Sequence, residues 1–117
     1  MTLNHFTLDE FKCSCCGVNY TDPEFIRRLD KARDFAGVPF VVTSGYRCAE
    51  HNGNVGGSPT SSHLKGVAAD LSARDSVMRV RIVRALMAVG FERIGVSDSF
   101  IHVDEDTLKP EKVMWRY

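Results

Sequence analysis

The chain lacks any long hydrophobic run and any excess of charge of one sign. No stretch approaches the ~20 consecutive apolar residues that a membrane-spanning helix requires. Basic and acidic residues number 15 each, so the formal net charge is zero. This balance gives no reason to expect nucleic acids or acidic membranes as partners. Segment 1–12 has no basic region followed by an apolar one, so we expect no secretory signal and a protein that is cytoplasmic as synthesised.

Repeats, linkers and low-complexity segments are also absent from the sequence, which argues against a fibrous or disordered chain. The 117 residues are 44% hydrophobic and 26% charged, which are ordinary values for a globular protein. This length suits one modest hydrophobic core. We therefore expect a single domain over residues 1–117, and we favour a monomer.

Capping residues and glycines mark the expected helices. Thr21 or Asp22 can cap a helix that has Pro23 in its first turn and ends at Gly37. A second helix is expected over residues 75–89, ended by Gly90. On its inward side we expect Val80, Val83 and Met87.

Short strands are expected between and after these helices, at 40–43, 66–72, 93–96 and 100–104, with a long loop over 44–62. The tight turn between the last two strands suits only antiparallel pairing. The sequence therefore predicts an α+β fold, with helices packed on one face of a small antiparallel sheet.

Two of these strands carry polar residues that could bind a metal ion. Alternate strand residues share a face, so Asp70 projects from a floor of small residues that includes Gly66 and Ala68, and His63 precedes them. In the strand 100–104, His102 and Asp104 point away from the apolar side. If the two strands are neighbours, His63, Asp70 and His102 converge as three zinc ligands and leave a fourth position for water. Taken alone, each residue has a simpler interpretation, namely a structural histidine or a capping aspartate.

These residues also form a recognisable motif. The chain resembles the zinc D-Ala-D-Ala carboxypeptidase family, which includes dipeptidases and phage endolysins and shares its fold with the hedgehog signalling domain. The matching segments are Ser61-x-His63-x-x-Gly66-x-Ala68-x-Asp70, His102-x-Asp104, and upstream Ser44-Gly45-Tyr46-Arg47 and His51-Asn52. The upstream segments resemble the carboxypeptidase branch of the family.

The resemblance implies roles for several of these residues. It implies that His63, Asp70 and His102 bind a catalytic Zn²⁺. It also implies that Arg47 binds substrate and stabilises the charge that develops on the attacked carbonyl. Ser61 either holds substrate or caps its loop.

The sequence leaves the general base open between two carboxylates. Many relatives place an acid or a histidine a few residues before the last ligand, where this chain has Asp98 between Ser97 and Ser99. Asp104 shares a strand face with His102, so it could act as the base or could orient a ligand histidine. The family pattern favours Asp98, and the strand geometry favours Asp104.

A cysteine cluster forms a second possible metal site. Cys13-x-x-Cys16 and Cys48-x-x-His51 have the spacing of a structural Cys₃His zinc site. Such a site would tie the N-terminal segment to the loop that carries Arg47. A disulfide from Cys48 to an N-terminal cysteine, or free thiols, would explain the same residues.

Together, the motifs predict a zinc-dependent peptidase that hydrolyses peptide bonds in bacterial cell-wall peptides. The expected partners are peptidoglycan stem peptides, and an endolysin of this kind would reach the wall through a holin-like pore. The alternatives are a zinc-containing binding module without catalytic activity and a virion-associated structural protein of the same fold.

Overall fold

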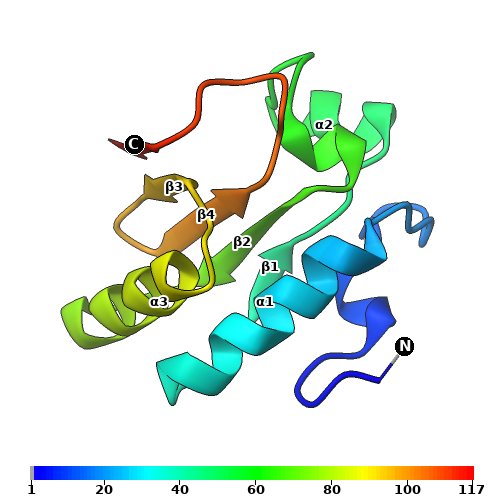
Figure 1. Ribbon diagram of the computed structural model, residues 1–117. Helices are drawn as coiled ribbons and strands as arrows, with labels where there is room; N and C mark the ends of the chain where they lie inside the picture. The colour runs from blue at the N-terminus through cyan, green and yellow to red at the C-terminus, as the bar shows by residue number, and fades with distance from the viewer. Residues whose placement is uncertain (1) are drawn as a thin grey trace.

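The computed structural model describes residues 2–117 and has the predicted α+β fold, with a five-stranded sheet (Figure 1). In chain order the elements are η1 (Leu8–Phe11), α1 (Pro23–Ala36), β1 (Val42–Ser44), α2 (Ala49–Asn54), η2 (Ser62–Lys65), β2 (Ala68–Ser72), α3 (Ser76–Ala88), β3 (Arg93–Val96), β4 (Phe100–Asp104) and β5 (Val113–Arg116). Within the described part, no helix is long and apolar enough to cross a membrane.

The strand order of the sheet is β1-β2-β4-β3-β5. The pairs β1–β2, β2–β4 and β3–β4 are antiparallel, as the sequence predicts. The expectation of antiparallel pairing throughout is wrong at the edge, where β5 pairs with β3 in parallel. Asp104 at the end of β4 and Val113 at the start of β5 both lie beside Arg93, so the connection stays at one end of the sheet and crosses the start of β3. The chain therefore reverses direction, and β5 runs antiparallel to β4 and parallel to β3.

Both long helices begin and end where the capping residues predict. The Asp22 side chain accepts a hydrogen bond from the Glu24 N–H at the start of α1, and Gly37 closes that helix with a left-handed φ of 67°. Asp75 caps α3 in the same way by accepting from the Met78 N–H. These caps satisfy backbone groups that a helix end otherwise leaves without a partner.

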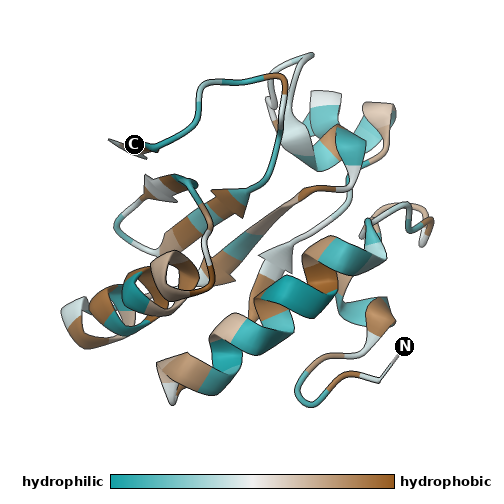
Figure 2. Ribbon diagram, viewed as in Figure 1, coloured by the Kyte–Doolittle hydropathy of each residue, from teal (hydrophilic) through white to brown (hydrophobic). Residues whose placement is uncertain are grey.

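Helices α1 and α3 lie side by side over one face of the sheet (Figure 1). Strand residues on this face are apolar, so hydrophobic and hydrophilic residues alternate along β2 and β4 (Figure 2). The core contains Phe11, Phe25 and Phe40, each at most 1% exposed. Each buried aromatic side chain of this size contributes about 1.5–3 kcal/mol relative to an exposed one. The opposite face of the sheet is therefore left for polar side chains.

Three predictions about local structure need correction. The predicted loop 44–62 contains the short helix α2, whose glycine and asparagine content hid it, and the strand β5 was not predicted. In α3 the inward-facing residues are Ile82, Ala85 and Leu86, whereas Val80 and Met87 are more than half exposed. Val83 packs against the core as predicted, but apolar residues occur all around this helix, so periodicity alone did not identify its buried side.

Candidate metal centre

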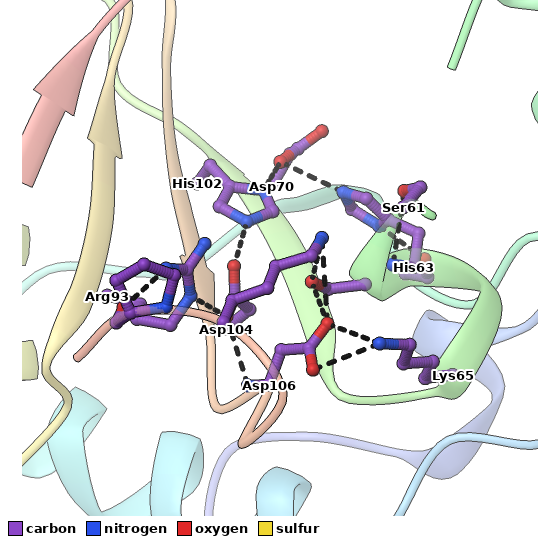
Figure 3. Close-up of polar contacts among 12 residues, drawn as sticks. Ser61, His63, Lys65, Asp70, Arg93, His102, Asp104 and Asp106 are labelled. Atoms are coloured by element: carbon purple, nitrogen blue, oxygen red, sulfur yellow. Dashed lines mark hydrogen bonds and ion pairs between the residues drawn. The ribbon is translucent and has the colours of Figure 1, made fainter. Parts of the chain in front are cut away.

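The polar face of the sheet brings together the three residues expected to bind metal. Asp70 of β2 lies directly opposite His102 of β4 in the antiparallel register. His63 comes from η2, which turns into β2 at Gly66 with a left-handed φ of 72°. His102 Nδ1 lies 2.9 Å from Asp70 Oδ1, and His63 Nε2 lies 3.3 Å from the same oxygen. Figure 3 shows the Asp70 carboxylate between the two imidazole rings.

The outer nitrogen of each histidine has its own partner. His63 Nδ1 lies 2.7 Å from the Gly45 carbonyl, which can only accept, so this nitrogen donates. His102 Nε2 lies 2.7 Å from Asp104 Oδ2 (Figure 3). In the neutral form of each ring, a proton held on the outer nitrogen leaves a lone pair on His63 Nε2 and on His102 Nδ1, the two atoms that face Asp70, whereas in the protonated form these atoms donate to its carboxylate. Fixing the tautomer in this way is characteristic of histidines that bind metals.

Electrostatics favours the ionised form of both aspartates. Burial raises the pKa of Asp70, but hydrogen bonds with His102 and His63 outweigh it and hold this pKa well below its usual value. Burial lowers the pKa of His102, whereas its contacts with Asp104 and Asp70 raise it, and the net shift is upward. The pKa of Asp104 is raised by burial but lowered overall by His102, the Asp106 N–H and Arg93.

These donors fit a zinc ion. One ligand atom from each of His63, Asp70 and His102 lies within 4.8 Å of the other two. Two imidazole nitrogens and one carboxylate oxygen are a common zinc set, and a tetrahedral ion would keep its fourth position for substrate or water. All three residues are at most 8% exposed. This preorganised group is largely shielded from water, and a bound cation would compensate the buried negative charge of Asp70.

Arg47 lies at the edge of the same group. Its Nη2 is 3.5 Å from Asp70 Oδ2, the carboxylate oxygen that does not face the histidines. Its Nε donates to Ser44 Oγ and its Nη1 to Asn52 Oδ1. The Asn52 side chain is in turn held by the Ser58 carbonyl. Ser44 precedes Arg47 in the chain and Asn52 follows it, and together they hold the guanidinium beside the centre.

Ser61 has a local structural contact. Its Oγ accepts a hydrogen bond from the His63 N–H and so caps η2 (Figure 3). Ser61 also lines the cavity over the metal centre, so both predicted roles remain available to it.

The two candidate general bases lie in different surroundings, and neither faces the metal side. Asp98 is exposed in the turn between β3 and β4 and does not line the cavity, which argues against the base that the family pattern favours. Asp104 contacts the outer nitrogen of His102, on the ring edge away from Asp70. Its other oxygen accepts from Arg93 Nε and from the Asp106 N–H. These contacts place Asp104 where it can orient the His102 ring.

A cavity of about 380 Å³ lies over the three residues. Sequence reasoning named several of its lining residues but missed Arg93 and Trp115 as members of the site. The Trp115 ring lies 5.5 Å from the His102 ring between centroids, and Arg93 lies over Trp115. The sequence signal for Trp115 is weak, because Val113, Met114 and Trp115 are three consecutive apolar residues and show no alternation that would assign the indole to one face of a strand.

The structure groups the three predicted cysteines with a fourth residue that the spacing did not select. Among the described residues, the second group with metal-binding geometry contains Cys13, Cys15, Cys16 and Cys48. His51 is not in this group, and its Nε2 lies 3.2 Å from Ser14 Oγ. Cys15 takes the place that the spacing assigned to His51.

The sheet and η2 thus place two histidines and an aspartate at the base of one cavity, an arrangement compatible with the zinc centre of a hydrolase. The chain belongs to the peptidase M15 family, whose sequence profile matches residues 4–104. Peptidases of this family depend on zinc, and the chain is accordingly a metallopeptidase by family. No curated protein matches the chain. The family match ends at the last residue of β4, so β5 and Trp115 lie beyond it.

Proposed function

We propose that this protein is a zinc-dependent peptidase that hydrolyses peptide bonds in the stem peptides of bacterial peptidoglycan, in the manner of a phage endolysin. The observation that carries the proposal is the position of Arg47 beside His63, Asp70 and His102 at the base of one cavity. When bound, zinc supplies Lewis-acid chemistry, which polarises a carbonyl and lowers the pKa of water.

The protein's own residues supply orientation and charge. Asp104 holds the His102 ring so that Nδ1 faces the centre, and the Gly45 carbonyl does the same for Nε2 of His63. The fixed Arg47 guanidinium is placed to stabilise negative charge that develops on an attacked carbonyl oxygen. Arg93 and Lys109 line the same cavity, so with Arg47 three basic side chains border the space for stem peptides, which carry free carboxylates.

One observation favours the alternative, a zinc-containing binding module or a virion-associated structural protein of this fold. The carboxylates that line the cavity are Asp70 and Asp104, and both are engaged with histidines. No carboxylate among the described lining residues is therefore free to accept a proton. A binding module predicts bound zinc without turnover.

The decisive experiment follows the release of free amines from purified peptidoglycan by the zinc-loaded protein, with fragment masses determined by mass spectrometry. We expect release by the wild type and none by Asp70→Ala, which removes a metal ligand. Arg47→Ala should retain zinc and lose about 10²–10³-fold in turnover, the usual effect of removing one oxyanion-stabilising donor. Arg84→Ala, at an exposed arginine of α3, is the matched control and should behave as the wild type.

The fragment masses would identify the bond that is cut. Zinc-loaded wild type that releases no amine would contradict the peptidase and support the binding module. Activity on the wall in a cell also requires passage out of the cytoplasm, for which we propose release through a holin-like pore.

A further inference from the structure

Four thiols meet on the side of the molecule where the N-terminal segment reaches the Arg47 loop. Cys13, Cys15 and Cys16 come from one turn, and Cys48 directly follows Arg47. One sulfur from each lies within 4.8 Å of the other three. Cys13 is fully buried, Cys48 is half-buried, and the remaining two are exposed. This group is separate from the histidine centre.

The sulfur separations match those around a tetrahedral ion. Cys13 Sγ lies 3.6 Å from Cys15 Sγ and 3.7 Å from Cys48 Sγ, and the Cys15–Cys48 distance is 3.4 Å. Zinc–sulfur bonds of ~2.3 Å in a tetrahedron place neighbouring sulfurs ~3.8 Å apart. A disulfide would bring two sulfurs to ~2.05 Å. The thiols are therefore arranged at the spacing of ligands that share one ion.

The backbone of the turn is closed so that its three cysteines face the same point. The Cys13 N–H donates to the Val18 carbonyl, and the Gly17 N–H donates back to the Cys13 carbonyl, both at 2.8 Å. Gly17 adopts a left-handed φ of 76°, which a glycine accepts without strain.

Backbone N–H groups also point at two of the sulfurs. The Cys48 N–H donates to Cys13 Sγ at 3.5 Å, and the His51 N–H donates to Cys48 Sγ at 3.4 Å. Such hydrogen bonds stabilise the negative charge of thiolates, the form in which cysteine binds metals.

We propose that Cys13, Cys15, Cys16 and Cys48 bind one structural Zn²⁺. Four protein ligands leave no open position, so this ion has no catalytic role. The site does not depend on the proposed peptidase activity, since a binding module of the same fold would contain it equally.

The ion would tie the N-terminal turn to the residues around the histidine centre. Between the two ends, the Tyr46 N–H donates to the Phe11 carbonyl at 2.8 Å. Gly45 packs so closely on Phe11 that a Cβ there would lie 2.6 Å from the Phe11 oxygen. The Gly45 carbonyl in turn fixes His63. Zinc at the thiols therefore holds both Arg47 and the backbone acceptor of His63 in place.

The test counts zinc per chain in protein purified under reducing conditions, using elemental mass spectrometry. We expect two zinc ions in the wild type and one each in Cys48→Ser and Asp70→Ala, which remove different sites. His51→Ala is the matched control for the ligand set and should keep two. Cobalt loaded into Asp70→Ala should produce the intense near-ultraviolet charge-transfer bands of thiolate–cobalt bonds.

The cobalt spectrum decides the proposal even if Cys48→Ser fails to fold, because it is recorded on a chain that keeps all four thiols. Absence of thiolate bands from cobalt-loaded Asp70→Ala would overturn the site. A native mass lower by the two hydrogens of a disulfide would also overturn it. Loss of the second zinc from His51→Ala would overturn the four-cysteine set in favour of one that contains His51.

Discussion

Both oxygens of Asp104 are engaged, and this limits what the residue can do. Oδ2 faces His102 Nε2 at 2.7 Å, and Oδ1 accepts from Arg93 Nε at 2.7 Å and from the Asp106 N–H at 3.0 Å. A carboxylate can accept in both directions, whereas an amide has one accepting oxygen and one donating nitrogen. The site therefore requires a carboxylate at this position even though it does not face the metal side.

Replacement of Asp104 by asparagine should weaken zinc binding at the histidine centre. An amide that accepts from His102 directs its own N–H₂ at Arg93, so one contact becomes a clash of two donors. We expect about 10–100-fold lower zinc affinity, the usual cost of losing a carboxylate that orients a metal-bound histidine. The measurement is the zinc concentration that restores half-maximal peptidase activity to metal-free protein.

Asp98→Asn is the matched control, because it makes the same change at the other carboxylate that the sequence offered as a base. It should bind zinc and turn over substrate as the wild type does. If Asp98→Asn retained zinc but lost turnover, the general base would be Asp98 after all, and the turn between β3 and β4 would have to move on substrate binding.

At the scale of secondary-structure elements, the segment of β5 adds an aromatic wall, formed by Trp115 and Tyr117, to the histidine centre on β2 and β4. The wall depends on Gly95 of β3, which lies opposite both His102 and Trp115 in the sheet register. A Cβ at this glycine would lie 2.6 Å from Trp115 Nε1 and 2.9 Å from the Tyr117 ring. The absence of a side chain is what lets the indole lie against the strand.

Gly95→Ala should displace Trp115 and destabilise the protein by about 1–3 kcal/mol, the typical cost of overpacking. Because the chain has one tryptophan, its fluorescence reports this displacement directly. Urea unfolding gives the change in free energy. Gly53→Ala in α2 is the control: nothing lies within 4 Å of its added Cβ, and alanine favours a helix. Equal stability changes in the two variants would refute the proposed packing.

Whether an element of the fold could be predicted from the sequence depends on whether its signal is local. Caps and periodicity identify α1 and the strands of the metal centre, because those signals are local. The helix α2 carries Gly53 and two asparagines and owes its stability to its surroundings, which local propensity does not contain. The parallel pairing of β5 depends on the connection from β4 crossing the start of β3, and no local pattern encodes that.

The candidate site divides in a similar way. Strand alternation placed Asp70 and His102 on one face, and this required only the two-residue period. The role of Asp104 depends on which edge of an imidazole faces the centre, which spacing cannot specify. Likewise, the spacing Cys48-x-x-His51 selected His51, whereas the turn closed by Gly17 brings Cys15 close to the other three sulfurs.

At the scale of the whole molecule, Asp106 joins the loop before β2 to the connection after β4. It is 4% exposed and accepts from Ser62 Oγ and from Lys65 Nζ, and Figure 3 shows the contact with Lys65. Burial raises the pKa of Asp106, but hydrogen bonds from Lys65, Ser62 and the Leu108 N–H lower it from 3.8 to about 2. The folded protein therefore favours the ionised form more strongly than the unfolded chain does.

Asp106 should consequently stabilise the protein above about pH 4 and lose this contribution as the pH falls toward about 2. The difference in pKa corresponds to about 2 kcal/mol. We expect Asp106→Asn to lower the free energy of unfolding in urea by roughly this amount at pH 7, with the gap to wild type closing near pH 2. Metal-free protein should be used, so that acid release of zinc does not contribute. A gap that stays constant with pH would contradict the assignment.

The pairing of Asp70 with His102 across β2 and β4 has a consequence for how the chain folds. A slip of one residue between these strands would turn His102 toward the helices and separate the ligands. An ion bound by His63, Asp70 and His102 would therefore recognise the native register alone and stabilise it by mass action. Zinc present during refolding would then favour the native pairing of β2 with β4, independently of any substrate.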